Sequence, residues 1–420
     1  MKKKNKILND PVYGFIGVLE KNLIDLIDHP FFQRLKRIKQ LGLTYYVYPG
    51  AIHTRFHHTL GATHLMNLAI NILKQKGINI SDTEALAAKQ AILLHDIGHG
   101  PFSHALEHSI VNVSHEAISI KIMNELAKTF DLDLAIKLFQ GNYKKKFLHD
   151  LISSNLDVDR LDYLKRDSFF TGVSEGVIGT ERIIKMLNVH DNRLVVEEKG
   201  LHSVENFLIA RELMYWQVYL HKTVTIAEQM LIKVLKRAKE LSKQIDLYST
   251  PPLKFFLKNE VSINDFNNKT SIFGKKHTVL EVFTLLDDSD ITSALKAWTY
   301  SSDKILSELS RRLLNRNLFK ITFQNTTFDN KKIKEIEKLI SISNNLNKED
   351  VSYFFINDKI TLPKIKSNED EIKILSSNKI IPLSKATEII NINMFSKSTE
   401  KHYIIYPENN KKEIIRILDK

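Results

Sequence analysis

The spacing of apolar positions predicts helices along most of the chain. Between residues 30 and 41 the apolar side chains recur at helical intervals, and the same pattern predicts a helix over about 57–76. Gly77 stands where a helix C-terminal cap is expected. The segment 81–84 reads Ser-Asp-Thr-Glu and matches a capping box, so a further helix should carry residues 85–94 into the core.

The pattern changes in the last quarter of the chain. Helical periodicity continues to about Leu318, over the segments 116–130, 132–139, 204–219 and 225–241. Beyond it, short runs typical of strands occupy 321–323, 353–356, 380–381 and 403–406. Segment 248–276 gives no interpretable pattern. We therefore expect a mainly α fold, with a core over residues 1–320 and a small C-terminal α+β lobe over residues 321–420.

Composition limits the classes of protein to which the chain can belong. Of its 420 residues 43% are hydrophobic, which is enough for a sizeable core. No run of about 18 uncharged apolar residues predicts a membrane span, and the basic first residues lead into no secretory signal. Cysteine is absent, so disulfides and thiolate metal sites are excluded. A cytoplasmic protein is expected, and any metal must be held by imidazole and carboxylate groups.

The formal net charge of +12 indicates several kinds of partner. Nucleic acid, a membrane surface and polyanionic small molecules would each suit a basic protein. The lysines are spread along the chain without a long basic tract, which favours a generally Lys-rich composition over a dedicated nucleic-acid surface. A nucleotide partner, with weak nucleic-acid binding beside it, fits this charge.

Histidine is concentrated in residues 53–115, and the centre of this stretch, 94–104, reads Leu-His-Asp-Ile-Gly-His-Gly-Pro-Phe-Ser-His. Histidine both ligates metals and transfers protons near neutral pH. A helix turns about 100° per residue, so the adjacent His95 and Asp96 can reach one ion only if it lies off the helix end. Such an ion needs further ligands from elsewhere in the chain.

His58 and Asp159 are the candidates for these further ligands. Two imidazoles and two carboxylates, with positions left for water, suit Fe, Mn, Zn, Co, Ni or Mg. A bound cation would acidify water and generate a hydroxide nucleophile at neutral pH.

Three ordered blocks of sequence, 55–61, 95–104 and 157–163, resemble the H…HD…D signature of HD-domain phosphohydrolases. More narrowly, the chain resembles the deoxynucleoside triphosphate triphosphohydrolase (dNTPase) branch, which has bacterial and vertebrate members. The similarity extends upstream to residue 32 and downstream at least to His221, and weakly as far as Phe319. It implies an HD-type helical bundle, one divalent metal held by His58, His95, Asp96 and Asp159, and hydrolysis of a deoxynucleoside triphosphate (dNTP) to deoxynucleoside and inorganic triphosphate.

The resemblance also assigns roles around the metal. Proton transfer beside the α-phosphate needs a nearby acid or base, and His104 is the first candidate for the general acid. The other expected catalytic residues are His99, His115, Glu107 and Glu116. Phosphate contacts are expected from Arg55 and from Arg160, which stands where relatives have Lys. Contacts to the sugar are expected from Tyr163, Asp167, Gln40 and Leu41, the last two at the edge that recognises the missing 2′-hydroxyl. Magnesium could accompany the nucleotide phosphates.

A second implied feature is an effector-nucleotide site, of the dGTP or GTP type, made between the subunits of a homo-oligomer (dimer or tetramer). Its expected residues are Lys6, Asn9, Asp28, Gln33 and Lys36. Departures from the family pattern occur at Lys36, where the vertebrate relative has Arg, and at Gln217 and Thr225, where it has Arg and Tyr.

Several alternatives stay open from sequence. Isolated histidines are more often structural than ligating, and this interpretation applies to His53, His57, His64, His108, His149 and His202. Tyr215, Trp216 and Tyr219 are interpreted as core or subunit interface. Another HD phosphohydrolase activity, on nucleoside monophosphates, cyclic dinucleotides or guanosine tetraphosphate, would use the same metal residues. A nucleotide sensor or nucleic-acid binder with a vestigial site is the alternative from a different class.

Overall fold

The computed structural model describes residues 6–18, 20–102, 107, 109–361, 371–387 and 400–419. The helices of the first half are α1 (Lys21–Asp28), α2 (Pro30–Gln33), α3 (Arg55–Gln75), α4 (Asp82–Leu94), α6 (His115–Leu126), α7 (Asp133–Phe139), α8 (Lys146–Asp150), α9 (Val158–Thr171) and α10 (Thr180–Met186). Those that follow are α11 (Leu201–Met214), α12 (Lys222–Leu241), α13 (Pro251–Lys258), α14 (Val279–Thr284), α15 (Asp288–Trp298), α16 (Lys304–Leu314), α17 (Asn330–Ser343), α18 (Val351–Phe354), α19 (Leu383–Ala386) and α21 (Lys411–Asp419). The mainly α expectation is confirmed.

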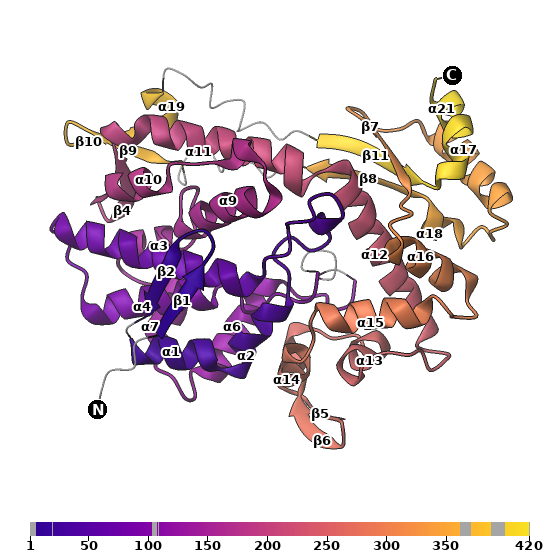
Figure 1. The fold of residues 1–420 in the computed structure, drawn as a ribbon, viewed down its shortest axis with the longest axis horizontal. Helices are drawn as coiled ribbons and strands as arrows, with labels where there is room; N and C mark the ends of the chain where they lie inside the picture. Colours follow the sequence, from indigo (N-terminus) through magenta and orange to yellow (C-terminus); the bar gives the residue numbers. More distant parts are fainter. Residues whose placement is uncertain are drawn as a thin grey trace.

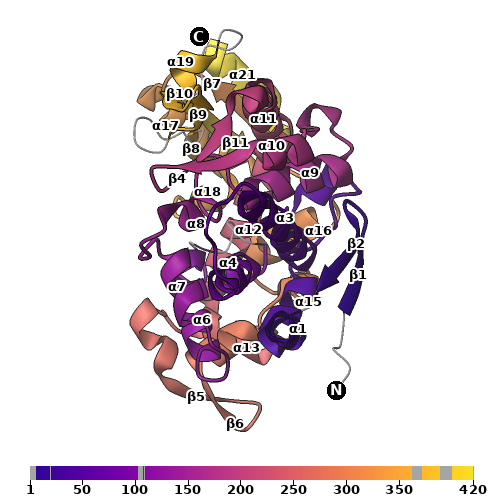
Figure 2. The same ribbon diagram turned by 90° about the vertical axis from the view of Figure 1, so that its left-hand side faces the viewer.

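Short strands form four small sheets among the described residues. The strands are β1 (Lys6–Asp10), β2 (Gly14–Val18), β3 (Leu187–His190), β4 (Arg193–Glu197), β5 (Lys269–Ile272), β6 (Lys275–Thr278), β7 (Lys320–Gln324), β8 (Ile356–Thr361), β9 (Lys373–Ser376), β10 (Lys379–Pro382) and β11 (Glu400–Tyr406). Their orders are β1-β2, β10-β9-β4-β3, β7-β11-β8 and β5-β6. The antiparallel β1–β2 hairpin pairs Lys6 with Val18 and Asp10 with Gly14, and it lies against α3 (Figures 1 and 2).

The α4 helix forms the centre of the helical bundle. Its residues from Ala85 to Leu94 are almost all buried, because α3 and α7 pack around it. The predicted capping box is confirmed, since the Ser81 hydroxyl accepts from the Glu84 amide and the Glu84 carboxylate accepts from the Ser81 amide. A helix that is buried all round presents its functional groups at its ends, and α4 ends at His95.

Close contact between α3 and α9 depends on a glycine. A Cβ atom at Gly61 would lie 2.0 Å from Oδ1 of Asp162 and 2.2 Å from Nη2 of Arg166. Any side chain at this position would therefore push α9 away from α3. The absence of a side chain brings His58, one turn before Gly61, into contact with α9.

The C-terminal residues pack in two separate places. Strand β11 joins β7 and β8 at one end of the molecule, close to α17 and α21 (Figure 1). Strands β9 and β10 instead extend the β3–β4 hairpin near α10 and α11, where Val196 of β4 pairs in parallel with Ile374 of β9. The division of the chain at residue 320 stays a prediction.

One strand prediction is wrong. Residues 353–356 do not start a strand, because α18 extends to Phe354 and β8 begins only at Ile356. Tyr353, Phe354 and Phe355 are all buried. A short apolar run of this kind has no periodicity that distinguishes a buried helical turn from a strand. Strands at 321–323, 380–381 and 403–406 are confirmed.

No helix among the described residues combines the length and the apolar character needed to cross a membrane.

Candidate metal centre and surrounding site

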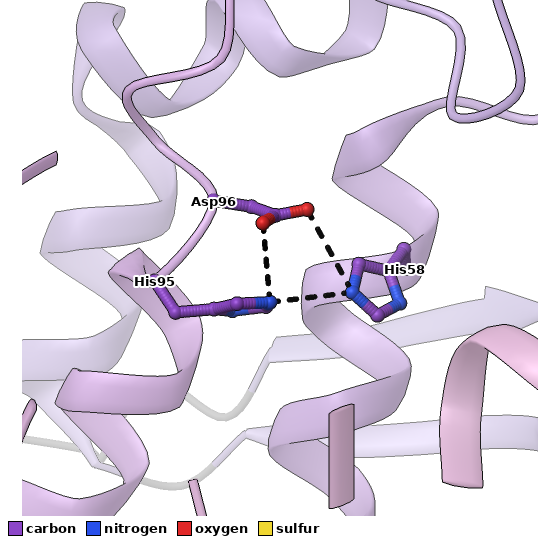
Figure 3. A group of neighbouring side chains, drawn as sticks. All are labelled: His58, His95 and Asp96. Atoms are coloured by element: carbon purple, nitrogen blue, oxygen red, sulfur yellow. Dashed lines mark hydrogen bonds and ion pairs between the residues drawn. The ribbon is translucent and has the colours of Figure 1, made fainter. Parts of the chain in front are cut away.

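Three side chains meet at the end of α4, and Figure 3 shows them pointing toward one common space. His58 comes from the first turns of α3, His95 is the C-cap of α4, and Asp96 follows it. Nε2 of His58 lies 3.4 Å from Nε2 of His95 and 3.8 Å from Oδ2 of Asp96. Nε2 of His95 lies 3.3 Å from Oδ1 of Asp96. These distances suit ligands that share one ion.

Asp159 joins this group from a third helix. Asp157 caps α9 by accepting from the Arg160 amide, and this places Asp159 in the first turn. Oδ1 of Asp159 lies 3.0 Å from Nε2 of His58 and 3.4 Å from Nε2 of His95. The structure thus brings together all four residues predicted as metal ligands.

Hydrogen bonds fix the tautomers of both histidines. Nδ1 of His95 lies 2.7 Å from the carbonyl oxygen of Ile92, which can only accept, and Nδ1 of His58 lies 2.7 Å from Oδ2 of Asp162. In the neutral rings the proton therefore sits on Nδ1, and the lone pair sits on Nε2. Both Nε2 lone pairs point into the same space, which is the arrangement that metal-binding histidines require.

The electrostatics of the cluster favour a cation. Burial alone would lower the pKa of His58, but its bonds to Asp159 and Asp162 outweigh burial and raise the pKa to about 10. Burial works against ionisation of Asp159 as well, yet its bonds to His58 and His95 hold the pKa of Asp159 below its ordinary value. The acidic groups thus stabilise positive charge in their midst, and the donor set fits a divalent metal ion.

Behind the cluster, Asp162 is held by Arg166. Nε of Arg166 donates to Oδ2 of Asp162 at 2.9 Å, and its Nη1 donates to Oδ2 of Asp10 at 2.8 Å. Sequence alone did not predict the contact between Arg166 and Asp10, because Asp10 lies far from α9 in the chain.

A second group of histidines lies next to Asp96. Nη1 of Arg55 donates to Oδ2 of Asp96 at 2.5 Å, and Nε2 of His99 lies 3.3 Å from its Oδ1. The ring of His99 stacks on His115 with 3.8 Å between centroids. His115 in turn contacts Glu107, with 3.1 Å between Nδ1 and Oε1. Four of the predicted residues, Arg55, His99, His115 and Glu107, therefore form a line that starts at the metal cluster.

The two other predicted catalytic residues are His104 and Glu116. His104 lies outside the described residues. Glu116 is in the first turn of α6, with an exposed side chain.

The start of α6 packs closely against the loop after α4 because residue 98 is a glycine. A Cβ atom at Gly98 would lie 2.2 Å from the carbonyl oxygen of His115.

The residues predicted to contact sugar and phosphate form a row along α9. Nη1 of Arg160 lies 3.4 Å from the hydroxyl of Tyr163, whose ring meets Tyr219 edge-on at 6.1 Å. The hydroxyl of Tyr219 donates to Oδ2 of Asp167 at 2.8 Å, and Nε2 of His53 lies 2.7 Å from Oδ1. The row therefore runs from Arg160 to a buried carboxylate that is held on both oxygens.

Gln40 and Leu41 lie near the Asp167 end of this row. The Gln40 amide donates to the His53 carbonyl at 3.0 Å, and Leu41 packs against the core. Among the described residues, the buried Oε1 of Gln40 and Nδ1 of His53 have no hydrogen-bond partner. Gln40 and His53 thus each keep one buried polar atom that could bond to a ligand.

Sequence reasoning missed His53, Tyr219 and Arg34. His53 and Tyr219 were interpreted as structural, but both contact Asp167. Arg34 is fully buried and donates to the carbonyl oxygens of Leu286, Ile97 and His99, so it fixes the loop after α4. Single residues of this kind carry no sequence signal, although Tyr219 lies in a π-helical turn, a feature that often marks functional sites.

The predicted effector residues are partly brought together. Lys6 of β1 makes an ion pair with Asp28 of α1. Asn9 is exposed on the hairpin, and Nε2 of Gln33 donates to the Ile27 carbonyl at 2.6 Å. Lys36 lies over the ring of Phe56.

Comparison with known proteins gives the family. Residues 55–167 match the HD domain, and residues 178–249 match the HD associated region. YwfO of Bacillus subtilis is 33% identical over 97% of this chain and 93% of its own. The crystal structure of a phosphohydrolase from Bacteroides thetaiotaomicron is 48% identical and superposes with a TM-score of 0.91 over 96% of this chain and 100% of that one.

Two relatives carry the name deoxynucleoside triphosphate triphosphohydrolase SAMHD1. The human protein is 27% identical over 75% of this chain and 54% of its own, and the Dictyostelium discoideum homolog is 32% identical over 60% and 52%. This chain therefore spans about half the length of these SAMHD1 proteins. With the four predicted metal ligands in one cluster, the chain belongs to the HD-domain phosphohydrolases and is a relative of the dNTPases among them.

Proposed function

We propose that this protein hydrolyses dNTPs to deoxynucleoside and inorganic triphosphate in a reaction that depends on a divalent metal. The observation that carries the proposal is the meeting of Nε2 of His58 and Nε2 of His95, 3.4 Å apart, beside the carboxylates of Asp96 and Asp159. The names of the SAMHD1 relatives support the choice of substrate. An ion of Fe, Mn, Zn, Co, Ni or Mg held there would supply Lewis-acid chemistry, lowering the pKa of water and polarising a phosphoryl oxygen.

The chain's own residues would bind the phosphates and move the protons. Arg55 contacts Asp96 of the cluster and Arg160 contacts Tyr163, and their planar guanidinium groups suit phosphate oxygens. Breaking the bond between the α-phosphorus and the 5′-oxygen leaves an alkoxide that must receive a proton. His99 beside Asp96 and His115 beside Glu107 are the described groups that could move that proton. His104 remains the first candidate for its final donor.

Recognition of the sugar would centre on Asp167. Its carboxylate is buried and is held by His53 and Tyr219, so it is oriented before any ligand arrives. Tyr163 and the free Oε1 of Gln40 supply further polar atoms, and Leu41 supplies an apolar wall. We propose that a sugar hydroxyl bonds to this group, and that the Gln40–Leu41 edge leaves no room for a 2′-hydroxyl.

Product identification tests the proposed function. Metal-free protein reloaded with Mn²⁺ is incubated with each dNTP and each ribonucleotide, and the products are separated by anion-exchange chromatography. We expect deoxynucleoside and intact triphosphate, with little turnover of ribonucleotides. Release of pyrophosphate or single phosphate would contradict the proposal. Turnover of nucleoside monophosphates, cyclic dinucleotides or guanosine tetraphosphate instead would indicate another HD phosphohydrolase activity.

The hydrogen bond from Tyr219 to Asp167 gives a sharper prediction. Tyr219→Phe removes one of the two groups that orient Asp167, and we expect kcat/KM for dNTPs to fall by about 10-fold or more, since one hydrogen bond to a charged group is worth about 1.5 kcal/mol or more. The matched control is Tyr143→Phe, which loses a similar bond to Glu84 in the first turn of α4, at the end opposite the metal cluster. Equal steady-state constants for the Tyr219→Phe and Tyr143→Phe proteins would contradict this role.

We further propose that the protein acts in the cytoplasm as a homo-oligomer with an effector-nucleotide site of the dGTP or GTP type. The ion pair between Lys6 and Asp28 supports it, because two of the predicted effector elements meet there. Lys36 adds to this support, since it lines a cleft of about 520 Å³ with Lys296, and their positive charge suits phosphates, whereas Arg37 and Lys39 in the same cleft pair with Asp287 and Asp288.

A further inference from the structure

A buried chain of charged groups connects the N-terminal hairpin with the metal cluster. It runs from Asp10 through Arg166 and Asp162 to His58. Arg166, Asp162 and His58 are each 0% exposed, and Asp10 is 5% exposed. All contacts along this chain are direct hydrogen bonds between side chains, so no solvent separates the hairpin from the metal ligand.

Arg166 binds two carboxylates with one planar group. Towards Asp162, its Nε and Nη2 donate to Oδ2 and Oδ1 at 2.9 and 3.0 Å. Towards Asp10, its Nη1 and Nη2 donate to Oδ2 and Oδ1 at 2.8 and 3.4 Å. Such two-pronged pairs fix direction as well as distance. The Asp162 carboxylate that holds Nδ1 of His58 is therefore oriented by a guanidinium that Asp10 orients in turn.

Asp10 also forms the hairpin turn. Its Oδ1 accepts from the amides of Val12 and Tyr13, at 2.9 and 3.0 Å, just after β1 ends. The ring of Tyr13 lies 5.6 Å from the Arg166 guanidinium. The Asp10 carboxylate thus holds the turn between β1 and β2 and also accepts hydrogen bonds from Arg166.

We propose that Asp10 and Arg166 are positioning residues for the metal ligand His58, and that through them the β1–β2 hairpin and the metal centre stabilise each other. The inference rests on the metal site of the proposed function and not on its substrate. Outer partners of this kind hold a ligating imidazole in the required tautomer and orientation. Because coupling between two sites is reciprocal, metal binding must stabilise the hairpin as much as the hairpin favours the metal.

The test uses full-length, metal-free protein and Mn²⁺ as the probe. Asp10→Asn keeps the side-chain oxygen for the turn but sets an amide nitrogen against Nη1 of Arg166, donor against donor. We expect the affinity for Mn²⁺, measured by calorimetry, to fall by about 3- to 10-fold. Loss of a residue that bonds directly to a metal ligand typically costs about 10- to 100-fold, and Asp10 acts on His58 only through Arg166 and Asp162. In hydrogen–deuterium exchange, Mn²⁺ should slow the amides of β1 and β2 in the wild type and no longer do so in Asp10→Asn.

Asp303→Asn is the matched control. Asp303 caps α16 and pairs with Arg237, with 2.6 Å between Oδ2 and Nη2, so this variant also removes a carboxylate from a cap and from a guanidinium. We expect it to keep the wild-type affinity for Mn²⁺ and the slowed exchange of the hairpin. A loss of both in Asp303→Asn would show a general effect of stability and would overturn the inference.

Wild-type affinity and wild-type slowing in a folded Asp10→Asn protein would also overturn it. Should Asp10→Asn fail to fold, Arg166→Lys provides the same two measurements, because lysine keeps the charge but cannot orient two carboxylates at once. Unchanged values in that variant would be equally decisive. A wild type that binds no Mn²⁺ would remove the metal site and this inference together, whereas a wild type that binds Mn²⁺ but cleaves no dNTP would remove only the proposed substrate.

Discussion

His95→Ala is expected to abolish divalent metal binding and, with it, hydrolysis. Nε2 of His95 is one of the two imidazole nitrogens of the cluster, and it lies 3.3 Å from Asp96 and 3.4 Å from Asp159. His95→Ala removes this nitrogen, so the cluster loses one of its four ligands. Loss of an outer partner alone costs about 10- to 100-fold in metal affinity or activity, so loss of a ligand should cost more than about 100-fold. Elemental analysis and dNTP turnover measure the two effects.

The control is another histidine of the same chain. The side chain of His202 is 77% exposed and bonds to Glu205 one turn away, so His202→Ala should keep both metal and activity. A His95→Ala protein that retains one bound metal ion per chain would contradict the assignment of His95 as a ligand.

Gly61→Ala is expected to lower the free energy of unfolding by about 3–5 kcal/mol, the range for disruption of a buried ion pair. The new methyl group would lie 2.0 Å from Asp162 and 2.2 Å from Arg166, and neither can move without breaking the bonds that join them. Urea unfolding of the metal-free protein, followed by circular dichroism, measures the change. Metal affinity should fall too, because Asp162 orients His58.

Gly179→Ala separates this effect from the general cost of replacing glycine. Gly179 precedes α10, its φ of −78° is open to any residue, and a Cβ atom there would meet nothing within 4 Å. Its free energy of unfolding should stay within about 0.5 kcal/mol of the wild type. Equal stability of the two alanine variants would contradict the close contact between α3 and α9.

The helices could be predicted from sequence because their signals are local. The capping box at Ser81 and the cap at Gly77 both lie within one turn of the helix end that they define. The hairpins were missed, although the β3–β4 and β5–β6 turns carry adjacent residues with positive φ, Asp191–Asn192 and Phe273–Gly274. Such pairs favour two-residue turns, but their strands are too short to show an alternating pattern.

The metal ligands were predictable for a different reason. His58, His95, Asp96 and Asp159 lie in blocks whose residue types and order are characteristic of the family. The residues that support them are spread along the chain, and nothing in the sequence joins Asp10 to Arg166 or His53 to Asp167. Their partnership arises only from the packing of helices.

The parallel pairing of β4 with β9 has a consequence for synthesis of the protein. Val196 leaves the ribosome roughly 180 residues before its partner Ile374, which at about 5–20 residues per second is a wait of roughly 10–35 s. During that time the free edge of β4 is exposed to pairing with other nascent chains. We therefore expect newly made protein to depend on chaperones until its last fifth has been translated.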